Sequence, residues 1–215
     1  SGIDCNSCGC TALIALLSRD RLYIACVGDS RAVLGSSKSC SSWVAEDLTI
    51  EQTPELAQER TRLAACGASV RRTDPDGPLR VCGRNRSLAM SRSLGDFDMK
   101  QIGVIPDPVV TVCEISEGNS CVVLASDGIW DVLSSQEAID VCCRYRSDAT
   151  SACRFLIKKA AQLWADQGLN RDDISGKFTP HPRAKALSPD ARPTLTFSHT
   201  PACNLSCRGL PSCAR

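Results

Sequence analysis

The sequence predicts a layered α+β domain, because short apolar strands joined by tight turns come first and two long amphipathic helices come last. A doubly wound parallel sheet is not predicted, since its strands and helices would alternate along the chain. The chain has 215 residues, of which 43% are hydrophobic and 4% aromatic. That length and composition suit one domain with a core of Leu, Val, Ile, Ala and Cys.

The first part of the chain predicts three short strands. Residues 11–17 and 21–27 are apolar runs separated by a Ser-Arg-Asp turn, a pattern typical of a hairpin. Both faces of the second run are apolar, so we expect that strand to be covered on both sides. Gly28-Asp29-Ser30 then turns the chain into a third strand over residues 31–34.

The middle of the chain predicts a helix and a second hairpin. Thr53-Pro54-Glu55 starts the helix, with Thr as the cap and Pro in the first helical position, and Gly67 ends it. Residues 109–115 and 120–125 are two further apolar runs. A Glu-Gly-Asn turn separates them, so we expect them to pair.

Two helices are predicted near the end of the body. Ser134 and Glu137 form a capping box in front of an apolar face. The next helix covers about residues 148–167, with its apolar side chains on one stripe, and Gly168 ends it. Hairpins followed by such helices are the basis of the α+β prediction.

The composition changes after Ser175. Residues 176–215 contain six of the eleven prolines, both histidines and an excess of basic residues. We therefore divide the chain into a domain over 1–175 and a Pro-rich tail over 176–215, which is either disordered or translated out of frame. The net charge of +1 predicts no binding to nucleic acid or to an anionic membrane. No apolar run approaches the ~20 residues that span a bilayer.

Fifteen cysteines are present, and several lie within apolar stretches, where a free thiol packs as a small hydrophobe. This placement favours a reducing compartment, the cytosol with the nucleus as a second location, over a disulfide framework. A zinc site built on Cys5, Cys8 and Cys10 is the less favoured alternative to simple packing.

Aspartate is the residue type that is abundant at strand ends and turns, whereas residues 1–175 contain no histidine. Catalysis by a Ser-His-Asp or Cys-His pair is therefore excluded from this part of the chain. Clustered carboxylates suit Mg²⁺ or Mn²⁺, although Asp is also common in turns and helix caps. The candidates are Asp29, Asp96, Asp127, Asp131, Asp172 and Asp173.

One segment favours metal binding over a purely structural role for these aspartates. Ser126-Asp127-Gly128-Ile129-Trp130-Asp131, directly after an apolar run, resembles the signature of the metal-dependent protein Ser/Thr phosphatases of type 2C. Further segments resemble that family in the same order, and the match covers roughly residues 8–175. They are Cys10-Thr11-Ala12, residues 27–34, Gly67-Ala68-Ser69-Val70, residues 88–96, Ile105-Pro106-Asp107-Pro108 and Arg171-Asp172-Asp173-Ile174-Ser175.

The resemblance implies an α-β-β-α sandwich of two antiparallel sheets flanked by helices, with its N-terminal portion missing here. It also implies two or three Mg²⁺ or Mn²⁺ ions that activate a water against phosphoserine or phosphothreonine. Asp127 resembles a core metal ligand, Asp172 the late ligand, and Asp29 the residue that holds a third ion. Asp173 stands where the family has Asn. Asp131 and Asp96 are interpreted as capping and loop-stabilising residues.

The chain also departs from the family pattern. It lacks the Asp-Gly-His-Gly-Gly segment and the Arg that grips substrate phosphate, and residues 176–180 replace an expected Val-rich strand. We therefore expect only the C-terminal part of a catalytic domain, inactive alone and with exposed sheet edges. The expected complete protein is a monomeric phosphatase that acts on phosphoproteins. The alternative is a catalytically dead, phosphatase-like interaction module.

Overall fold

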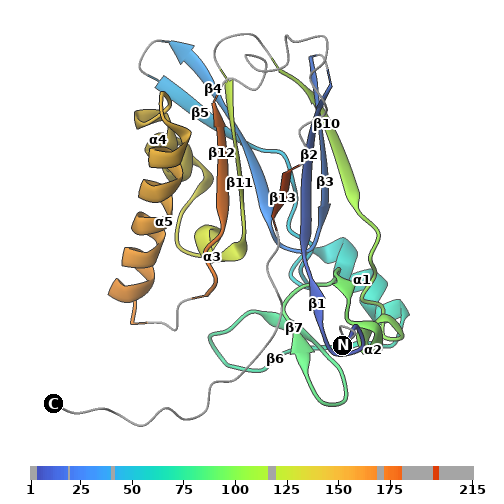
Figure 1. Ribbon diagram of the computed structural model, residues 1–215. Coiled ribbons are helices and arrows are strands. Elements are labelled where there is room, and N and C mark those ends of the chain that lie inside the picture. Colours follow the sequence, from blue (N-terminus) through green and yellow to red (C-terminus); the bar gives the residue numbers. More distant parts are fainter. Residues whose placement is uncertain are drawn as a thin grey trace, which may run out of the picture.

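Two antiparallel sheets lie face to face, and helices cover the outer side of one of them (Figure 1). The computed structural model describes residues 4–18, 20–39, 42–115, 120–168, 172–180 and 196–198. The α+β class predicted from the sequence is confirmed. Each sheet has four strands, in the orders β10-β3-β2-β13 and β12-β11-β4-β5.

The first sheet is built on the predicted N-terminal hairpin. Strands β2 (Ala12–Ser18) and β3 (Arg21–Val27) pair in register from Ala12 opposite Val27 to Ser18 opposite Arg21. Strand β10 (Val109–Glu114) joins the free side of β3, and β13 (Thr196–Ser198) joins the free side of β2.

The second sheet carries the candidate site. Its strands are β4 (Arg31–Ser39), β5 (Ser42–Asp47), β11 (Ser120–Ala125) and β12 (Gly176–Pro180). The predicted hairpin between residues 109–115 and 120–125 is wrong, because β10 pairs with β3 in the first sheet and β11 pairs with β4 and β12 in the second. Each of the two strands finds its partners and an apolar face to cover in a different sheet.

Strand β11 has apolar neighbours on both faces, which explains why all six of its residues are buried. Val122 and Leu124 face the first sheet and pack with its inward side chains, such as Leu13 and Ile24. Val123 points the other way, into the layer between the second sheet and the helices. Alternate residues of one strand therefore serve two cores.

The outer face of the second sheet is covered by α4 (Ser135–Arg144) and α5 (Ala149–Asp166), and the short α3 (Asp127–Trp130) lies at the end of β11 (Figure 1). The predicted capping box is present: Glu137 N donates to Ser134 Oγ, and Ser134 N donates to Glu137 Oε2. The Asp148 carboxylate caps α5 by accepting from the backbone N–H groups of Thr150 and Ser151. Both helices pack on the sheet with their apolar faces.

A third apolar cluster lies around α1 (Ala57–Ala65), which begins later than predicted and without a side-chain cap. Residues 53–56 form a turn instead, in which Leu56 N donates to Thr53 O. The cluster also includes α2 (Phe97–Lys100) and the sheet of β6 (Ser69–Arg72), β7 (Leu79–Cys82) and β8 (Ser87–Leu88). The short strands β1 (Gly9–Cys10) and β9 (Leu94–Gly95) pair beside it.

The boundary expected at residue 175 is not where the sheet ends. Residues 176–180 pair with β11, and Phe178 is buried there, so they belong to the folded layers. Residues 196–198 pair with β2. The remainder of the expected tail lies outside the described residues.

The described residues form three layers of the expected sandwich: two sheets and one set of helices. The outward side of β10 exposes Val110 (59%) and Val112 (50%). Within these same ranges, no helix is long and apolar enough to cross a membrane. Every described cysteine is a free thiol.

Candidate metal centre

Asp29 is positioned by a tight turn between β3 and β4. Gly28 has a φ of 102°, and a Cβ there would lie 2.4 Å from Thr11 Cγ2, so this position requires glycine. The buried Gln52 side chain holds the turn: its Oε1 accepts from Gly28 N at 2.7 Å, and its Nε2 donates to Cys26 O at 3.0 Å. Asp29 is only 8% exposed as a result.

Asp127 follows the last residue of β11 and starts α3. Its Oδ1 accepts from Gly128 N at 2.9 Å. The short helix is anchored by two indole groups, because Trp130 Nε1 donates to Ala125 O and Trp164 Nε1 donates to Gly128 O. The Asp127 carboxylate is thus fixed at the end of a fully buried strand.

Asp172 reaches the same end of the sheet from far along the chain. Ser126 N donates to Ser175 O at 3.0 Å, and Ser126 Oγ donates to Asp173 O at 3.1 Å. A Cβ on Gly128 would lie 2.4 Å from the same Asp173 carbonyl, so the two segments touch at backbone level. These contacts bring Asp172 to the end of β11.

The carboxylates at this end of the sheet repel one another. Burial, followed by the negative charges of Asp29 and Asp172, raises the pKa of Asp127 to about 8. Burial also raises the pKa of Asp29 to about 6, and Glu51, Asp131 and Asp172 add to that effect. Excess negative charge therefore gathers where the three sequence-predicted ligands lie.

We call Asp29, Asp127, Asp131, Asp172 and Glu51 the carboxylate cluster, and the sequence predicted no ligand role for two of its members. Asp131 was interpreted as a capping residue, but partial desolvation together with the charges of Glu51 and Asp172 raises its pKa to about 6. Glu51 received no role from the sequence. It pairs with Arg31, whose Nη2 lies 2.6 Å from Glu51 Oε1. The only available signal for Asp131 was its spacing, one helical turn after Asp127.

This carboxylate cluster fits part of a site for a hard divalent ion. Carboxylate oxygens are the ligands that Mg²⁺ and Mn²⁺ prefer, and a cation relieves the repulsion that raises these pKa values. Within the described ranges, no three His, Cys, Asp or Glu side chains converge closely enough to form a complete site. The same finding gives no support to a zinc site at Cys5, Cys8 and Cys10.

The comparisons with known proteins decide the family. The family model for protein phosphatase 2C matches residues 2–166. The chain is also 40% identical over 179 residues to the probable protein phosphatase 2C 34 of Arabidopsis thaliana, and 38% identical over 179 residues to the probable protein phosphatase 2C 73. The chain belongs to the protein phosphatase 2C family.

Coverage of the protein phosphatase 2C relatives is partial. The first alignment covers 80% of this chain and 50% of the relative, and the second 80% and 48%, so the chain spans about half the length of these relatives. Among solved structures, a serine-threonine phosphatase 2C from Toxoplasma gondii superposes with a TM-score of 0.69 at 23% identity, covering 76% of this chain and 55% of that one. That likeness confirms the fold.

Family membership confirms the resemblance, and metal dependence is a general property of that family. Membership leaves the individual ligands as predictions. Asp29, Asp127 and Asp172 lie near enough to one another for their charges to interact. The structure places Asp96 elsewhere: Asp96 is fully buried and pairs with Arg86 at 2.8 Å, beside β9 and α2.

Proposed function

We propose that this chain supplies the C-terminal half of a metal-dependent phosphatase site that hydrolyses phosphoserine and phosphothreonine in proteins. The observation that carries the proposal is the carboxylate cluster at the end of β11, with its raised pKa values. Membership of this chain in the protein phosphatase 2C family supports phosphate-ester hydrolysis as the reaction class.

Asp127 and Asp172 would hold the core ions, and Asp29 would hold a further ion, with Asp131 beside it. When bound, Mg²⁺ or Mn²⁺ supplies an activated water and neutralises charge that develops on the phosphoryl group. Two contacts support this proposal: Ser126, next to Asp127, bonds the backbone of Asp173, next to Asp172, and Gln52 fixes the turn that carries Asp29. The remaining ligands would come from sequence beyond these residues.

The test uses the 215-residue chain alone and the same chain joined to the preceding half of the Arabidopsis protein phosphatase 2C 34. Both are assayed for release of phosphate from a phosphothreonine peptide in millimolar Mn²⁺. We expect turnover from the joined protein only, and we expect EDTA to abolish it. Turnover that survives complete chelation would contradict the proposal.

The Asp127→Asn change in the joined protein should lower kcat by roughly 100-fold or more, because it removes a ligand charge without changing volume. Asp140→Asn is the matched control, since Asp140 lies on α4 and bonds to Gln136. Equal kcat values for the two variants at saturating Mn²⁺ would remove Asp127 from the ligand set.

The competing interpretation, a catalytically dead interaction module, is not favoured by relatives that are described as phosphatases. Phosphoproteins are the substrate class that follows from the family. A cytosolic location, a monomeric complete protein and the absence of nucleic-acid and membrane partners stay predictions.

A further inference from the structure

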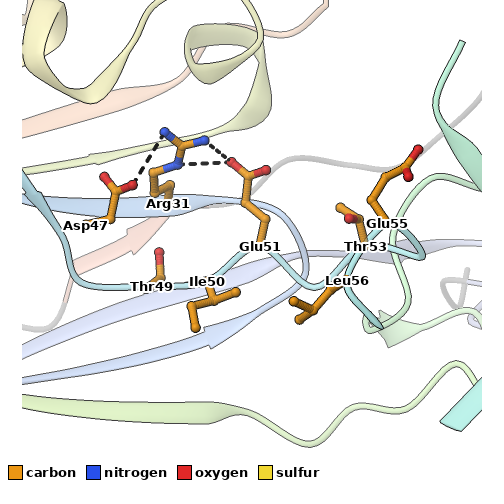
Figure 2. A pocket seen from close by; sticks show the side chains of 8 residues that line it. All are labelled: Arg31, Asp47, Thr49, Ile50, Glu51, Thr53, Glu55 and Leu56. Carbon is orange, nitrogen blue, oxygen red and sulfur yellow. Dashed lines mark hydrogen bonds and ion pairs between the residues drawn. The ribbon is translucent and has the colours of Figure 1, made fainter. Parts of the chain in front are cut away.

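A pocket lies beside the carboxylate cluster, between the end of β5 and the start of α1. Its volume is about 400 Å³, and it is lined by residues of the segment 47–56 together with Arg31 of β4. Figure 2 shows Arg31 on one side of this pocket, bonded to both Asp47 and Glu51, with Glu55 farther along the same segment.

The pocket is acidic overall. Asp47, Glu51 and Glu55 contribute three carboxylates, and Arg31 is the one basic residue among its lining residues. Arg72 lies just outside the lining and pairs with Glu55, whose Oε1 is 3.2 Å from Arg72 Nη2, so one negative charge is in excess. Asp47 and Glu55 are both about half exposed and keep an oxygen face open to a ligand. Arg31 is held back from a ligand, because its Nε and Nη2 both donate to Glu51 Oε1 and its Nη1 donates to Ser135 Oγ. Its guanidinium also lies 5.2 Å from the centre of a Trp130 ring.

The pocket also offers apolar surface. Ile50 is 66% exposed, the most exposed of the large hydrophobic residues in the described part of the chain. Leu56 lines the same pocket. A wall of aliphatic carbon next to carboxylates matches a Lys or Arg side chain, which has an aliphatic stem and a cationic end.

Glu51 connects this pocket to the candidate metal centre. It lines the pocket, and its negative charge also contributes to the raised pKa values of Asp29 and Asp131. An extended chain advances by at most ~3.3–3.6 Å per residue, so a peptide whose phosphate lies at the cluster reaches the pocket within a few residues.

We propose that this pocket binds a Lys or Arg side chain of the phosphoprotein, close to the phosphorylated residue, and so selects substrates with a basic neighbour. The proposal deepens the proposed function and rests on it. Ile50 and Leu56 contact the stem of the bound side chain, and Asp47 and Glu55 receive its charge.

The first experiment measures binding by the 215-residue chain, independent of hydrolysis. The chain is labelled with ¹⁵N and with ¹³C at the isoleucine methyl groups, then titrated with phosphoserine heptapeptides. These peptides carry Arg, Ala or Glu at one of the three positions on either side of the phosphoserine. At one or more positions the Arg peptide should bind about three- to fivefold more tightly than the Ala peptide, as expected of a partly exposed ion pair. Its shifts should fall on Ile50 and residues 47–56.

Two variants locate the selectivity. Asp47→Asn and Glu55→Gln should each reduce the Arg-to-Ala affinity ratio, and together they should bring it below about twofold. Glu114→Gln is the matched control, since Glu114 pairs with Arg21 on the first sheet, and it should keep the wild-type ratio. Glu51 is left unchanged, because its substitution would also alter Asp29 and Asp131.

The outcomes separate the two proposals. A wild-type ratio near one at every position, or a ratio that the double variant retains, overturns the basic-residue pocket. Chemical-shift changes of residues 47–56 with Mg²⁺ alone, and none with the Arg peptide, also overturn it, in favour of a cation site.

The joined protein then reports on catalysis. If it hydrolyses all peptides with equal kcat/KM, the pocket proposal fails while the phosphatase proposal stands. If selectivity appears in binding and no peptide is hydrolysed, catalysis fails and the pocket remains a site for basic peptides.

Discussion

Asp127 is the residue whose surroundings depart most from those of an ordinary surface carboxylate. It is attached to a fully buried strand, and it faces the charges of Asp29, Asp172 and Asp131. The folded protein therefore binds a proton at Asp127 that the unfolded chain releases near pH 4. A divalent ion removes the need for that proton, so metal and proton compete for the same oxygens.

This competition predicts how stability depends on pH. Because the pKa of Asp127 is raised to about 8 in the folded state, the folded state binds more protons than the unfolded state between about pH 4 and pH 8. Stability of the metal-free chain should then fall as pH rises through that window. Thermal unfolding with EDTA at pH 5 and at pH 8 checks this, with a lower Tm at pH 8 expected.

Millimolar Mn²⁺ should raise the Tm more at pH 8 than at pH 5, because the ion meets an ionised carboxylate only at the higher pH. The Asp127→Asn variant should lose most of both effects, while Asp140→Asn should keep them. A metal-free Tm that is flat or rising between pH 5 and pH 8 in the wild-type chain would contradict the raised pKa.

The sequence allows some residues of this carboxylate cluster to be predicted and hides others. Asp127 and Asp172 each lie in a recognisable motif, so their roles could be proposed without a structure. Glu51 lies in no such motif, and only folding brings it beside Arg31 and the turn at Asp29. An aspartate in a turn can cap a helix, shape the turn or bind a metal ion. Its role depends on which carboxylates from distant parts of the chain lie beside it.

At the scale of elements, local patterns predicted which segments form strands but not always which strands pair. The hairpin of β2 and β3 was correct because its two apolar runs are joined by a short turn. The same reasoning failed for residues 109–115 and 120–125, since these two runs find their partners in different sheets, and a turn-like sequence between two runs does not show that they pair. Residues 176–180 were missed because Gly and Pro lower the strand signal and their partner, β11, is distant in sequence.

Strand β12 should be necessary for metal binding. A chain that ends at residue 175 lacks the pairing with β11 and the buried Phe178, so its Tm should be roughly 5 °C or more below that of a chain that ends at residue 180. Its affinity for Mn²⁺, measured by calorimetry, should also fall, because the segment that carries Asp172 is then held only by the bonds of Ser126 to Asp173 and Ser175. Equal Mn²⁺ affinity in the two chains would show that β12 does not position Asp172.

At the scale of the whole molecule, the described residues cover the outer side of one sheet more completely than that of the other. The second sheet has α4 and α5 on its outer side, whereas the outward side of β10 leaves Val110 and Val112 exposed on an edge strand. Exposed apolar side chains on an edge strand favour association with other chains. We therefore expect the exposed side of β10 to promote self-association of the 215-residue chain.

Replacing both valines, in a Val110→Lys and Val112→Lys variant, should reduce self-association of the 215-residue chain at high concentration. Analytical ultracentrifugation should show a smaller average mass for this variant than for the wild type. A Gln162→Lys and Ala165→Lys variant, on the exposed side of α5, controls for the two added positive charges and should leave the average mass unchanged. An equal decrease in both variants would assign the effect to net charge.

Among the described strands, β12 lies at the edge of its sheet, and this position has a kinetic consequence. A strand paired on one side opens more often than a central strand, and its amide hydrogens exchange sooner. The residues just before β12 are bonded to Ser126, next to Asp127, so we expect an opening of β12 that extends to these bonds to free Asp172 from the end of β11. The residence time of a bound ion and the exchange rate of the amides of residues 177–179 should therefore report the same event.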